Sequence, residues 1–292
     1  MTFLKLHQMA EASIIKKYKK TIWHPFIGAL KDYQLIQSGD RIAVCISGGK
    51  DSMLLAKCIQ HLQLYSEVPF QAKYIVMDPG YNMENRQKIL DNVQKLQIPV
   101  TIFESNIFQV VGKNTGSPCY LCARMRRGHL YRAAQDAGCN KIALGHHFDD
   151  VIETILMSML YGAQIKTMMP KLHSTNFPGM ELIRPLYMVR EKAITSWARY
   201  NGLSFIRCAC RITQETEKQE NAEHSKRAEI KQLLAQLRKT SSYIDMNIFR
   251  SVHNINLSTI IGYREEENAP VHTFLDGYNT VTPHEMEGIS EK

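Results

Sequence analysis

Short apolar runs alternate with amphipathic stretches through the middle of the chain, between Gly39 and Gly162. The apolar runs favour strands over residues 41–46, 70–77, 100–104 and 141–144. The stretches between them repeat their apolar residues at helical spacing, which predicts helices over residues 52–64, 84–96, 122–137 and 150–161. Strands and helices that alternate in this order predict an α/β fold in which helices cover a parallel sheet.

The chain is less regular on either side of this alternating core. Residues 8–36 predict a helix that Pro25 breaks or kinks, because proline removes a backbone donor. After Gly162 the pattern predicts a long loop over 163–181, an extended run over 181–186, a helix over 190–201 and a last strand over 204–208. Residues 224–239 predict an amphipathic helix, whose apolar positions are Ile230, Leu233, Leu234 and Leu237.

Charge is spread unevenly along the chain. The formal net charge is +8, and residues 264–292 hold two basic residues against seven carboxylates, a net −5 that leaves +13 on the rest. A basic body suits a polyanionic partner, nucleic acid first, although solubility charge on exposed helices would give the same count. We expect the acidic tail to be loosely packed.

Length and composition limit the class of protein. The chain has 292 residues, and it contains no run of eighteen apolar residues, so no transmembrane helix and no membrane partner are expected. The first residues lack a charged region followed by an apolar core, so no secretory signal is expected and the cytoplasm is the predicted location. Seven cysteines, an odd number, argue against a disulfide framework.

A glycine-rich loop follows the first strand of the alternating region. It reads Ser47-Gly48-Gly49-Lys50-Asp51-Ser52 and leads directly into a helix. Glycines let the backbone approach a phosphate closely, and helix N-terminal N–H groups attract anions. Lys50 adds a cation, and the two serines can donate hydrogen bonds. The spacing is not that of a Walker A loop. A plain glycine turn with a solvated lysine is the alternative.

This loop resembles the pyrophosphatase loop (PP-loop) of the N-type ATP pyrophosphatases. Members cleave ATP between its α- and β-phosphates, adenylate a substrate oxygen and let a nucleophile displace AMP. The resemblance implies a Rossmann-like parallel sheet with helices on both faces, of the adenine nucleotide alpha hydrolase type. It implies that Asp78, after the second strand, lies near adenosine. It also places Lys50 and Asp51 among the catalytic residues.

Two cysteine pairs, Cys119/Cys122 and Cys208/Cys210, carry a second kind of chemistry. A C-x-x-C pair alone fits a zinc half-site, a redox pair, an iron–sulfur half-site or two incidental thiols. The second pair could complete a four-cysteine zinc site, although C-x-C spacing is less usual for zinc.

In combination, three motifs resemble the tRNA 2-thiocytidine synthetases, a branch of the PP-loop enzymes. They are Cys119-Tyr-Leu-Cys122-Ala-Arg124-Met-Arg126-Arg127-Gly128, Gly145-His146-His147-Phe148-Asp149-Asp150 and Ile183-Arg184-Pro185-Leu186. The resemblance runs from about Gly39 to Arg211. It implies a [4Fe–4S] cluster on three cysteines: Cys119, Cys122 and either Cys208 or Cys210. The family spaces its last two cysteines by two residues, whereas only Ala209 lies between them here, and position favours Cys210.

The run Gly145–Asp150 follows a strand and opens a helix. Aspartates in this position commonly cap a helix. The functional reading is that Asp149 and Asp150 hold Mg²⁺ on the triphosphate, with Asp150 catalytic, because hard oxygen ligands suit that ion. His146 and His147 are expected to line the site beside Gly145.

Basic and aromatic residues lie close to the first cysteine pair. Four arginines occupy the helix after it, at positions 124, 126, 127 and 132. A solvated helix face is the plain reading, and contact with RNA phosphates is the functional one. Tyr120 and Tyr131 could stack on bases or simply pack. Weaker candidates for RNA contact are Lys16, Lys17, Lys19 and Lys20.

The family resemblance implies ATP-dependent thiolation of tRNA. The O2 atom of a cytidine at anticodon-loop position 32 attacks the α-phosphate, and sulfur then displaces AMP to give 2-thiocytidine. A cysteine desulfurase persulfide or sulfide would donate the sulfur, and a homodimer stays open. Two alternatives are a lysidine-synthetase-like enzyme with an amine nucleophile and a zinc-stapled RNA-binding module with a vestigial loop.

Overall fold

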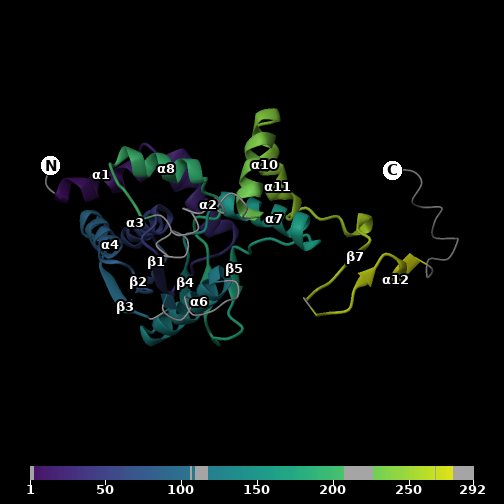
Figure 1. The fold of residues 1–292 in the computed structure, drawn as a ribbon, viewed down its shortest axis with the longest axis horizontal. Helices are drawn as coiled ribbons and strands as arrows, with labels where there is room; N and C mark the ends of the chain where they lie inside the picture. The colour runs from purple at the N-terminus through teal and green to yellow at the C-terminus, as the bar shows by residue number, and fades with distance from the viewer. Residues whose placement is uncertain (1–2, 106, 109–117, 207–225, 267, 279–292) are drawn as a thin grey trace. The chain divides into compact units, whose positions relative to one another are not determined.

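The protein was analysed as a computed structural model, which describes residues 3–105, 107–108, 118–206, 226–266 and 268–278 (Figure 1). The chain divides into two compact units, Met1–Asp245 and Met246–Lys292. The first unit contains the sheet and the helices that cover it. Within the described residues, no helix is both long enough and apolar enough to cross a membrane.

A six-stranded sheet forms the centre of the first unit, in the order β3-β2-β1-β4-β6-β5. Its strands are β1 Arg41–Ile46, β2 Gln71–Asp78, β3 Val100–Glu104, β4 Lys141–Ala143, β5 Lys171–His173 and β6 Glu181–Ile183. All neighbours pair in parallel except β5, which runs antiparallel to β6. The strand order reverses between β1 and β4, and ligands of such sheets bind in the crevice at that point.

The predicted alternating core is confirmed, and so is the Rossmann-like fold class. Two expectations after Gly162 are wrong. The expected loop over 163–181 contains β5, which the sequence hides because three residues are too few to show a period. Residues 204–206 form no strand, and the remainder of that expected strand lies outside the described residues.

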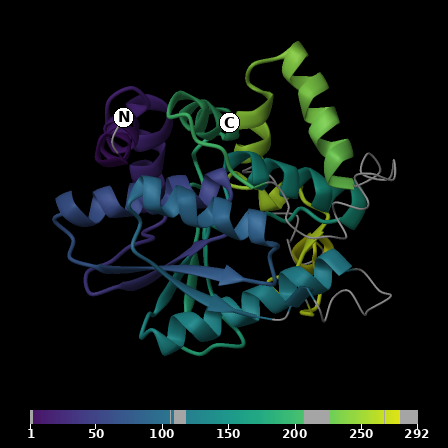
Figure 2. The same ribbon diagram turned by 60° about the vertical axis from the view of Figure 1, so that its left-hand side comes forward.

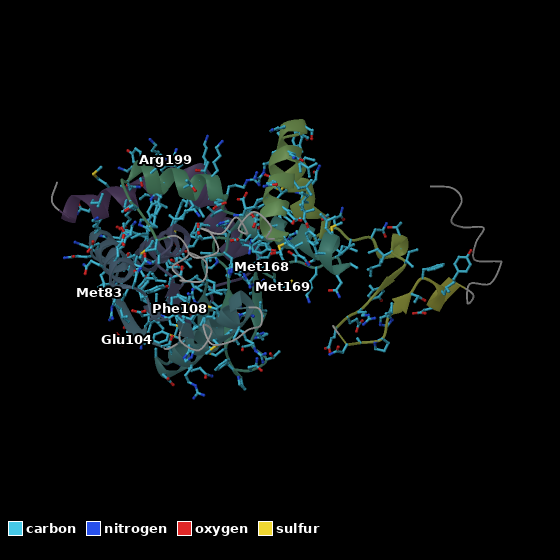
Figure 3. All side chains as sticks on the ribbon, in the orientation of Figure 1. Met83, Glu104, Phe108, Met168, Met169 and Arg199 are labelled. Carbon is cyan, nitrogen blue, oxygen red and sulfur yellow. The ribbon has the colours of Figure 1, made fainter. Side chains whose placement is uncertain are left out.

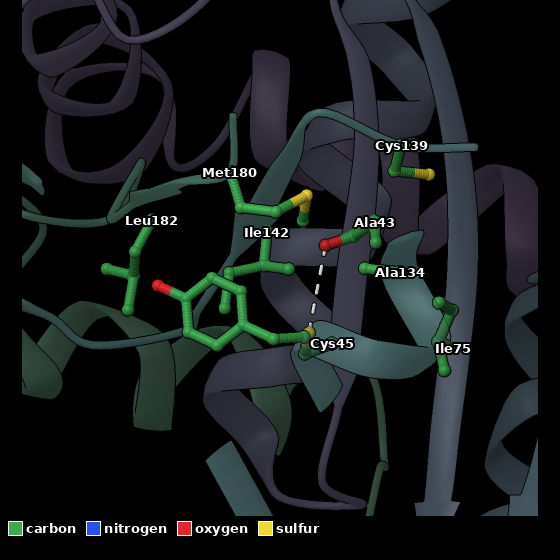
Figure 4. Packing of buried hydrophobic residues seen from close by; sticks show 9 residues of the cluster. Ala43, Cys45, Ile75, Ala134, Cys139, Ile142, Met180 and Leu182 are labelled. Carbon is green, nitrogen blue, oxygen red and sulfur yellow. Dashed lines mark hydrogen bonds between the residues drawn. The ribbon is translucent and has the colours of Figure 1, made fainter. Parts of the chain in front are cut away.

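Helices cover both faces of the sheet, with α3 and α4 on one face and α6 on the other (Figure 2). The helices of this core are α3 Lys50–Tyr65, α4 Met83–Leu96, α6 Pro118–Asp136, α7 Phe148–Gly162 and α8 Glu191–Tyr200. The face under α6 holds a cluster of buried residues from four strands, including Ala43, Ile75, Ile142 and Leu182 (Figure 4). On the other face of the sheet, α4 begins at the exposed residue Met83, labelled in Figure 3.

The N-terminal segment folds as α1 Phe3–Ile15, a π-helical turn η1 Lys19–Trp23 and α2 His24–Asp32. The predicted break at Pro25 is wrong in position. The helix ends near residue 15, and Pro25 lies in the first turn of α2, where its missing N–H has no helical partner to lose. The fully buried Lys57 of α3 ties α1 to the core, because its Nζ lies 3.4 Å from Glu11 Oε2.

The predicted amphipathic helix near residue 230 is confirmed as α10 Lys226–Thr240, with Ile230 and Leu234 buried. It packs against α7 (Figure 1). α11 Ile244–Ser251 follows it and continues into the second unit. That unit also holds a 3-10 turn, a two-stranded hairpin and a short helix: η3 Leu257–Thr259, β7 Gly262–Tyr263, β8 His272–Thr273 and α12 Leu275–Tyr278. The described part of the acidic tail is exposed, at 51% for Phe274 and 61% for Tyr278.

Candidate active site

A cavity of about 420 Å³ opens at the carboxyl ends of β1, β2 and β4, a size typical of small-molecule sites. Backbone and side chains from the glycine-rich loop, from the loops after β2 and β4, and from α6, α7 and α10 surround it. Its lining residues are Cys45, Ile46, Ser47, Asp51, Ser52, Met77, Tyr81, Arg126, Leu130, Leu144, Gly145, His146, Asp150 and Arg227. The site predicted from the loop therefore exists as a hollow at the switch point of the sheet.

The glycine-rich loop turns sharply between β1 and α3. Gly48 has φ +82°, and a Cβ there would lie 2.6 Å from Ile89 Cγ1 and 2.8 Å from Ile206 Cδ1. Gly49 is the N-cap of α3 and provides no side-chain cap. Ser52 closes the turn, because its Oγ accepts from the Ser47 N–H at 3.2 Å. The first-turn N–H groups of α3 are thereby left for an anion.

Lys50 lies between two carboxylates. Its Nζ donates to Glu191 Oε1 at 2.9 Å and to Asp51 Oδ2 at 3.2 Å. Burial disfavours the charged form of Lys50, but the two carboxylates outweigh burial and raise its pKa. Burial likewise raises the pKa of Glu191, and Lys50 outweighs it, so the net shift is downward. Lys50 is therefore held as a cation at the start of α3.

Asp51 is a buried acid with unused acceptor capacity. Its Oδ1 lies 3.1 Å from Lys50 Nζ, yet it accepts no well-oriented hydrogen bond from the described residues. Burial raises the pKa of Asp51, and Lys50 and His147 offset only part of that shift. A carboxylate in this condition gains most from a cation, because the cation restores the solvation that burial removed.

The two neighbouring aspartates of the second motif face different ways. Asp150 lines the cavity, closes a capping box with His147 and accepts from Arg227 Nη2 at 2.8 Å. Asp149 is buried outside that cavity. Its Oδ2 accepts from the Glu191 N–H at 2.7 Å and its Oδ1 from Arg238 Nη2 at 2.8 Å. The helix cap is His147 and not an aspartate, and His147 does not line the cavity as expected.

Gly145 brings the loop after β4 onto the first turn of α3. A Cβ at Gly145 would lie 3.0 Å from the backbone of both Asp51 and Ser52. The neighbouring His146 lines the cavity, and its Nδ1 has no partner among the described residues. Burial, with help from Arg184, lowers the pKa of His146 to about 4, so this ring is neutral at pH 7.

Replacing Gly145 by alanine should push α3 away from the loop after β4 and so distort the phosphate turn. The contacting atoms are backbone and cannot rotate aside, and overpacking of this kind costs about 1–3 kcal/mol. We expect ATP affinity to fall about 10-fold, measured by isothermal titration calorimetry. Gly128→Ala is the matched control, because a Cβ at Gly128 meets nothing within 4 Å. Equal affinity of the two variants would contradict this role for Gly145.

Asp78 is buried beneath the cavity and does not line it. Its Oδ1 accepts from the N–H groups of Gly80 at 2.9 Å and Tyr81 at 2.8 Å. That turn presents Tyr81, whose hydroxyl donates to Ser47 O at 3.3 Å. The predicted proximity of Asp78 to adenosine stays a prediction, and the neighbouring Met77 and Tyr81 are the side chains that the cavity exposes.

One member of the first cysteine pair lies close to the cavity. Cys122 is half-buried on α6 and packs against the pair Met77 and Ile107. One turn later Arg126 lines the cavity, with its guanidinium 5.3 Å from the ring of Phe108, labelled in Figure 3. The side chain of Cys119, together with Cys208 and Cys210, lies outside the described residues. The described side chains alone form no group of three or more metal ligands.

The remaining basic and aromatic candidates for RNA contact lie in different parts of the structure. Arg124 and Arg127 line a separate hollow of about 410 Å³ on the other side of α6. Tyr131 is buried and stacks on Phe177 at 4.9 Å, so it packs and is not available to a base. Tyr120 has no described side chain. Lys17 lies over the ring of Tyr200 at 3.8 Å.

Sequence reasoning missed three residues of this site. Glu191 holds Lys50, Arg227 holds Asp150, and Tyr81 contacts the phosphate loop. The only local signals were an acidic residue at the start of the helix that begins at Glu191 and an arginine on the amphipathic helix near residue 230. Neither signal points to a nucleotide site by itself.

Comparison with known proteins gives consistent matches. Residues 15–219 match the PP-loop domain. A tRNA-cytidine(32) 2-sulfurtransferase from Acaryochloris marina is 34% identical over 261 residues, covering 88% of this chain and 89% of that protein. The protein of the same name from Nitrosospira multiformis is 35% identical, with 90% and 88% covered. The structure resembles the U34-tRNA thiolase NcsA from Methanococcus maripaludis, solved with its [4Fe–4S] cluster, with a TM-score of 0.61, 20% identity, and 83% and 80% of the chains covered.

Proposed function

This chain belongs to the tRNA-cytidine(32) 2-sulfurtransferases of the PP-loop family, and on that premise we propose that it thiolates C2 of cytidine 32 in tRNA at the expense of ATP. The main observation that supports this site is the N-terminus of α3. It has no side-chain cap, and it lies beside the buried acid Asp51, which lines the cavity. The family assignment favours thiolation over the lysidine and zinc-module alternatives.

ATP would bind with its phosphates on the loop from Ser47 to Ser52. The first-turn N–H groups of α3 would hold the phosphates, as helix N-termini commonly do. The Lys50 ammonium lies at the same helix start, between Asp51 and Glu191. The adenosine then extends toward the apolar side of the cavity, where Ile46, Met77 and Leu130 lie.

Two carboxylates suit a magnesium ion on the triphosphate. Asp51 and Asp150 line the same cavity, and Asp51 Oδ1 has an unused lone pair. Mg²⁺ commonly takes one or two carboxylates together with substrate phosphates. Asp149 does not fit this role, because it does not line the cavity. Its two oxygens accept from the Glu191 N–H and from Arg238. Asp149 instead positions Glu191, which holds Lys50.

The first half-reaction activates the base. The cytidine O2 forms a bond to the α-phosphorus, the bond from that phosphorus to the bridging oxygen breaks, and pyrophosphate leaves. Lys50 and the α3 N–H groups stabilise charge on the phosphates as the bond breaks. In the second half-reaction a sulfur nucleophile bonds to C2, and AMP departs with the former O2. The donor would be sulfide, for which the step is complete, or a persulfide, which would also need a thiol reductant to cleave its S–S bond.

A [4Fe–4S] cluster fits the donor set of this chain. Thiolates are the usual ligands of such clusters, and Cys119, Cys122 and one of Cys208 and Cys210, by position Cys210, would hold it. Cys122 lies one turn from Arg126 at the cavity, and Ile206, two residues before Cys208, contacts the phosphate loop. When bound, the cluster would supply iron centres that can bind sulfur.

The pocket thiol itself is not the sulfur carrier. Cys45 lines the cavity, but burial raises its pKa to about 12, so it stays a thiol at pH 7. Its Sγ lies 3.7 Å from Ala43 O within the core (Figure 4). The thiolate is the nucleophilic form of cysteine, so the transferred sulfur has to come from another group.

The test of this function is product analysis with the anaerobically purified protein, tRNA, ATP and sulfide. We expect AMP and pyrophosphate in equal amounts, and 2-thiocytidine in the nucleoside digest of the tRNA. ADP as the nucleotide product, or tRNA that gains no sulfur while AMP forms, would rule the function out.

A further inference from the structure

The cavity is closed on one side by an arginine from a helix beyond the matched domain. The PP-loop match ends at residue 219, and α10 begins at Lys226. Arg227, the second residue of α10, nevertheless lines the cavity with Ser47, Asp51 and Ser52. The nucleotide site is therefore completed by a segment that the matched domain does not contain.

Two carboxylates of α7 hold the Arg227 guanidinium. Nε donates to Glu153 Oε2 at 2.7 Å, and Nη2 donates to Asp150 Oδ1 at 2.8 Å. Glu153 is 3% exposed, and Asp150 lies one turn earlier on the cavity wall. A buried carboxylate such as Glu153 requires a permanent counter-charge, so one side of the guanidinium is anchored while the other faces the cavity.

Packing fixes where this arginine points. Ile230 and Leu234 are buried, and they follow Arg227 at three and seven residues, on the same face of α10. Further along that face Arg238 reaches Asp149. The two ends of α10 thus contact the two adjacent aspartates of α7, which sets the helix at one position relative to the cavity.

The negative charges around the cavity indicate a role for Arg227. Asp51, Asp150 and the nearby Glu191 are acidic, and a triphosphate adds several negative charges. Lys50 is already shared between two carboxylates. If Mg²⁺ binds Asp150, the Nη2 group of Arg227 loses its partner and becomes available to a phosphate oxygen, whereas Nε stays on Glu153. Arginine suits this task because its planar fork binds two acceptors at once.

Building on the proposed function, we propose that Arg227 is a catalytic residue that contacts the β- and γ-phosphates of ATP and stabilises the departing pyrophosphate, with Glu153 as its positioning residue. The bond that breaks joins the α-phosphorus to the bridging oxygen, and the electron pair leaves on pyrophosphate. Arg227 neutralises the charge that appears there and transfers no proton.

The experiment compares two variants that preserve the buried environment. Arg227→Lys keeps the charge, and the double variant Arg227→Ala/Glu153→Gln removes both partners, so no buried charge is left unpaired. Lys231→Ala is the matched control, because Lys231 lies one turn later on α10 and 3.7 Å from the same Glu153, yet does not line the cavity. Thermal unfolding of each variant checks that it is folded.

Two readouts are measured: AMP formation at saturating tRNA, and the affinities for ATP and AMP by calorimetry. The double variant should lose about 100-fold in kcat and about 10-fold in ATP affinity, with AMP affinity unchanged. Arg227→Lys should recover part of the affinity for ATP and little of kcat. Lys231→Ala should match the wild type.

Glu153→Gln alone tests the positioning role. It should raise the KM for ATP more than it lowers kcat, because Arg227 keeps its charge but loses its anchor. A merely structural role would lower the unfolding temperature and leave the ratio of KM to kcat unchanged.

The outcomes separate this inference from the function on which it rests. A folded double variant that keeps wild-type kcat and ATP affinity, or a Lys231→Ala variant that loses as much, overturns the role of Arg227. Failure of the wild type to make AMP overturns the proposed function instead. In that case a loss of ATP affinity without loss of AMP affinity still establishes the contact with phosphates.

Discussion

Lys50→Ala should reduce AMP formation about 10³-fold, one of the two largest effects that we expect from any single substitution in this chain. The substitution has two consequences, and both reduce AMP formation. The phosphates lose their nearest ammonium group, and Asp51 and Glu191 lose the cation that lies between them. Both carboxylates then face the incoming triphosphate without compensation. The effect should therefore exceed the loss of one hydrogen bond.

The double variant Lys50→Ala/Glu191→Gln distinguishes the two consequences. Removing the negative charge of Glu191 should restore part of the ATP affinity, measured by calorimetry, and little of kcat. Lys192→Ala, an exposed lysine next to Glu191, serves as the control for a general loss of positive charge. If Lys50→Ala turns over within a few-fold of the wild type, the loop does not act on the phosphates as proposed.

The strands β1 to β4, the phosphate loop and the fold class could be predicted from sequence because their signals are local. A buried parallel strand shows as a continuous apolar run, and β1 is buried at every position after Arg41. The turn between β1 and α3 requires glycine at position 48 for a backbone reason, and that requirement is visible in six consecutive letters.

The partners of the loop could not be predicted, because they are distant in sequence. Glu191 is 141 residues from Lys50, and Arg227 is 77 residues from Asp150. Each lies on an amphipathic helix whose charged residues read as ordinary surface positions. Only the packing of α8 and α10 against the core decides which of those charges turns inward.

The different roles of the two adjacent aspartates also depend on packing, which the sequence alone does not show. Sequence alone treats Asp149 and Asp150 as equivalent, since both follow the same strand. Successive helical residues point about 100° apart, so one carboxylate enters the cavity while the other reaches the start of α8 and the end of α10. The motif therefore serves two purposes: one aspartate faces the cavity, and the other orients Glu191 and, through it, Lys50.

Cys122→Ala should abolish thiolation, to below about 1% of the wild type, and leave pyrophosphate release in a single turnover nearly unchanged. Within the proposal, activation of the cytidine uses the phosphate loop and the cavity residues, whereas delivery of sulfur needs the cysteine ligands. Cys122 lies on α6 and is not among the cavity lining residues, so its loss leaves the nucleotide contacts in place. The two half-reactions should therefore separate in this variant.

The measurement pairs 2-thiocytidine in tRNA digests with pyrophosphate release in a single turnover and with absorbance near 400 nm, about where such clusters absorb. Cys139→Ala is the matched control, since Cys139 is a buried thiol packed against the sheet beneath α6, in the cluster shown in Figure 4. It should keep both cluster absorbance and thiolation. A Cys122→Ala protein that retains both would show that the first cysteine pair does not hold the cluster. Loss of pyrophosphate release together with thiolation would instead mean that α6 shapes the nucleotide site, because Arg126 lies one turn beyond Cys122 on the cavity wall.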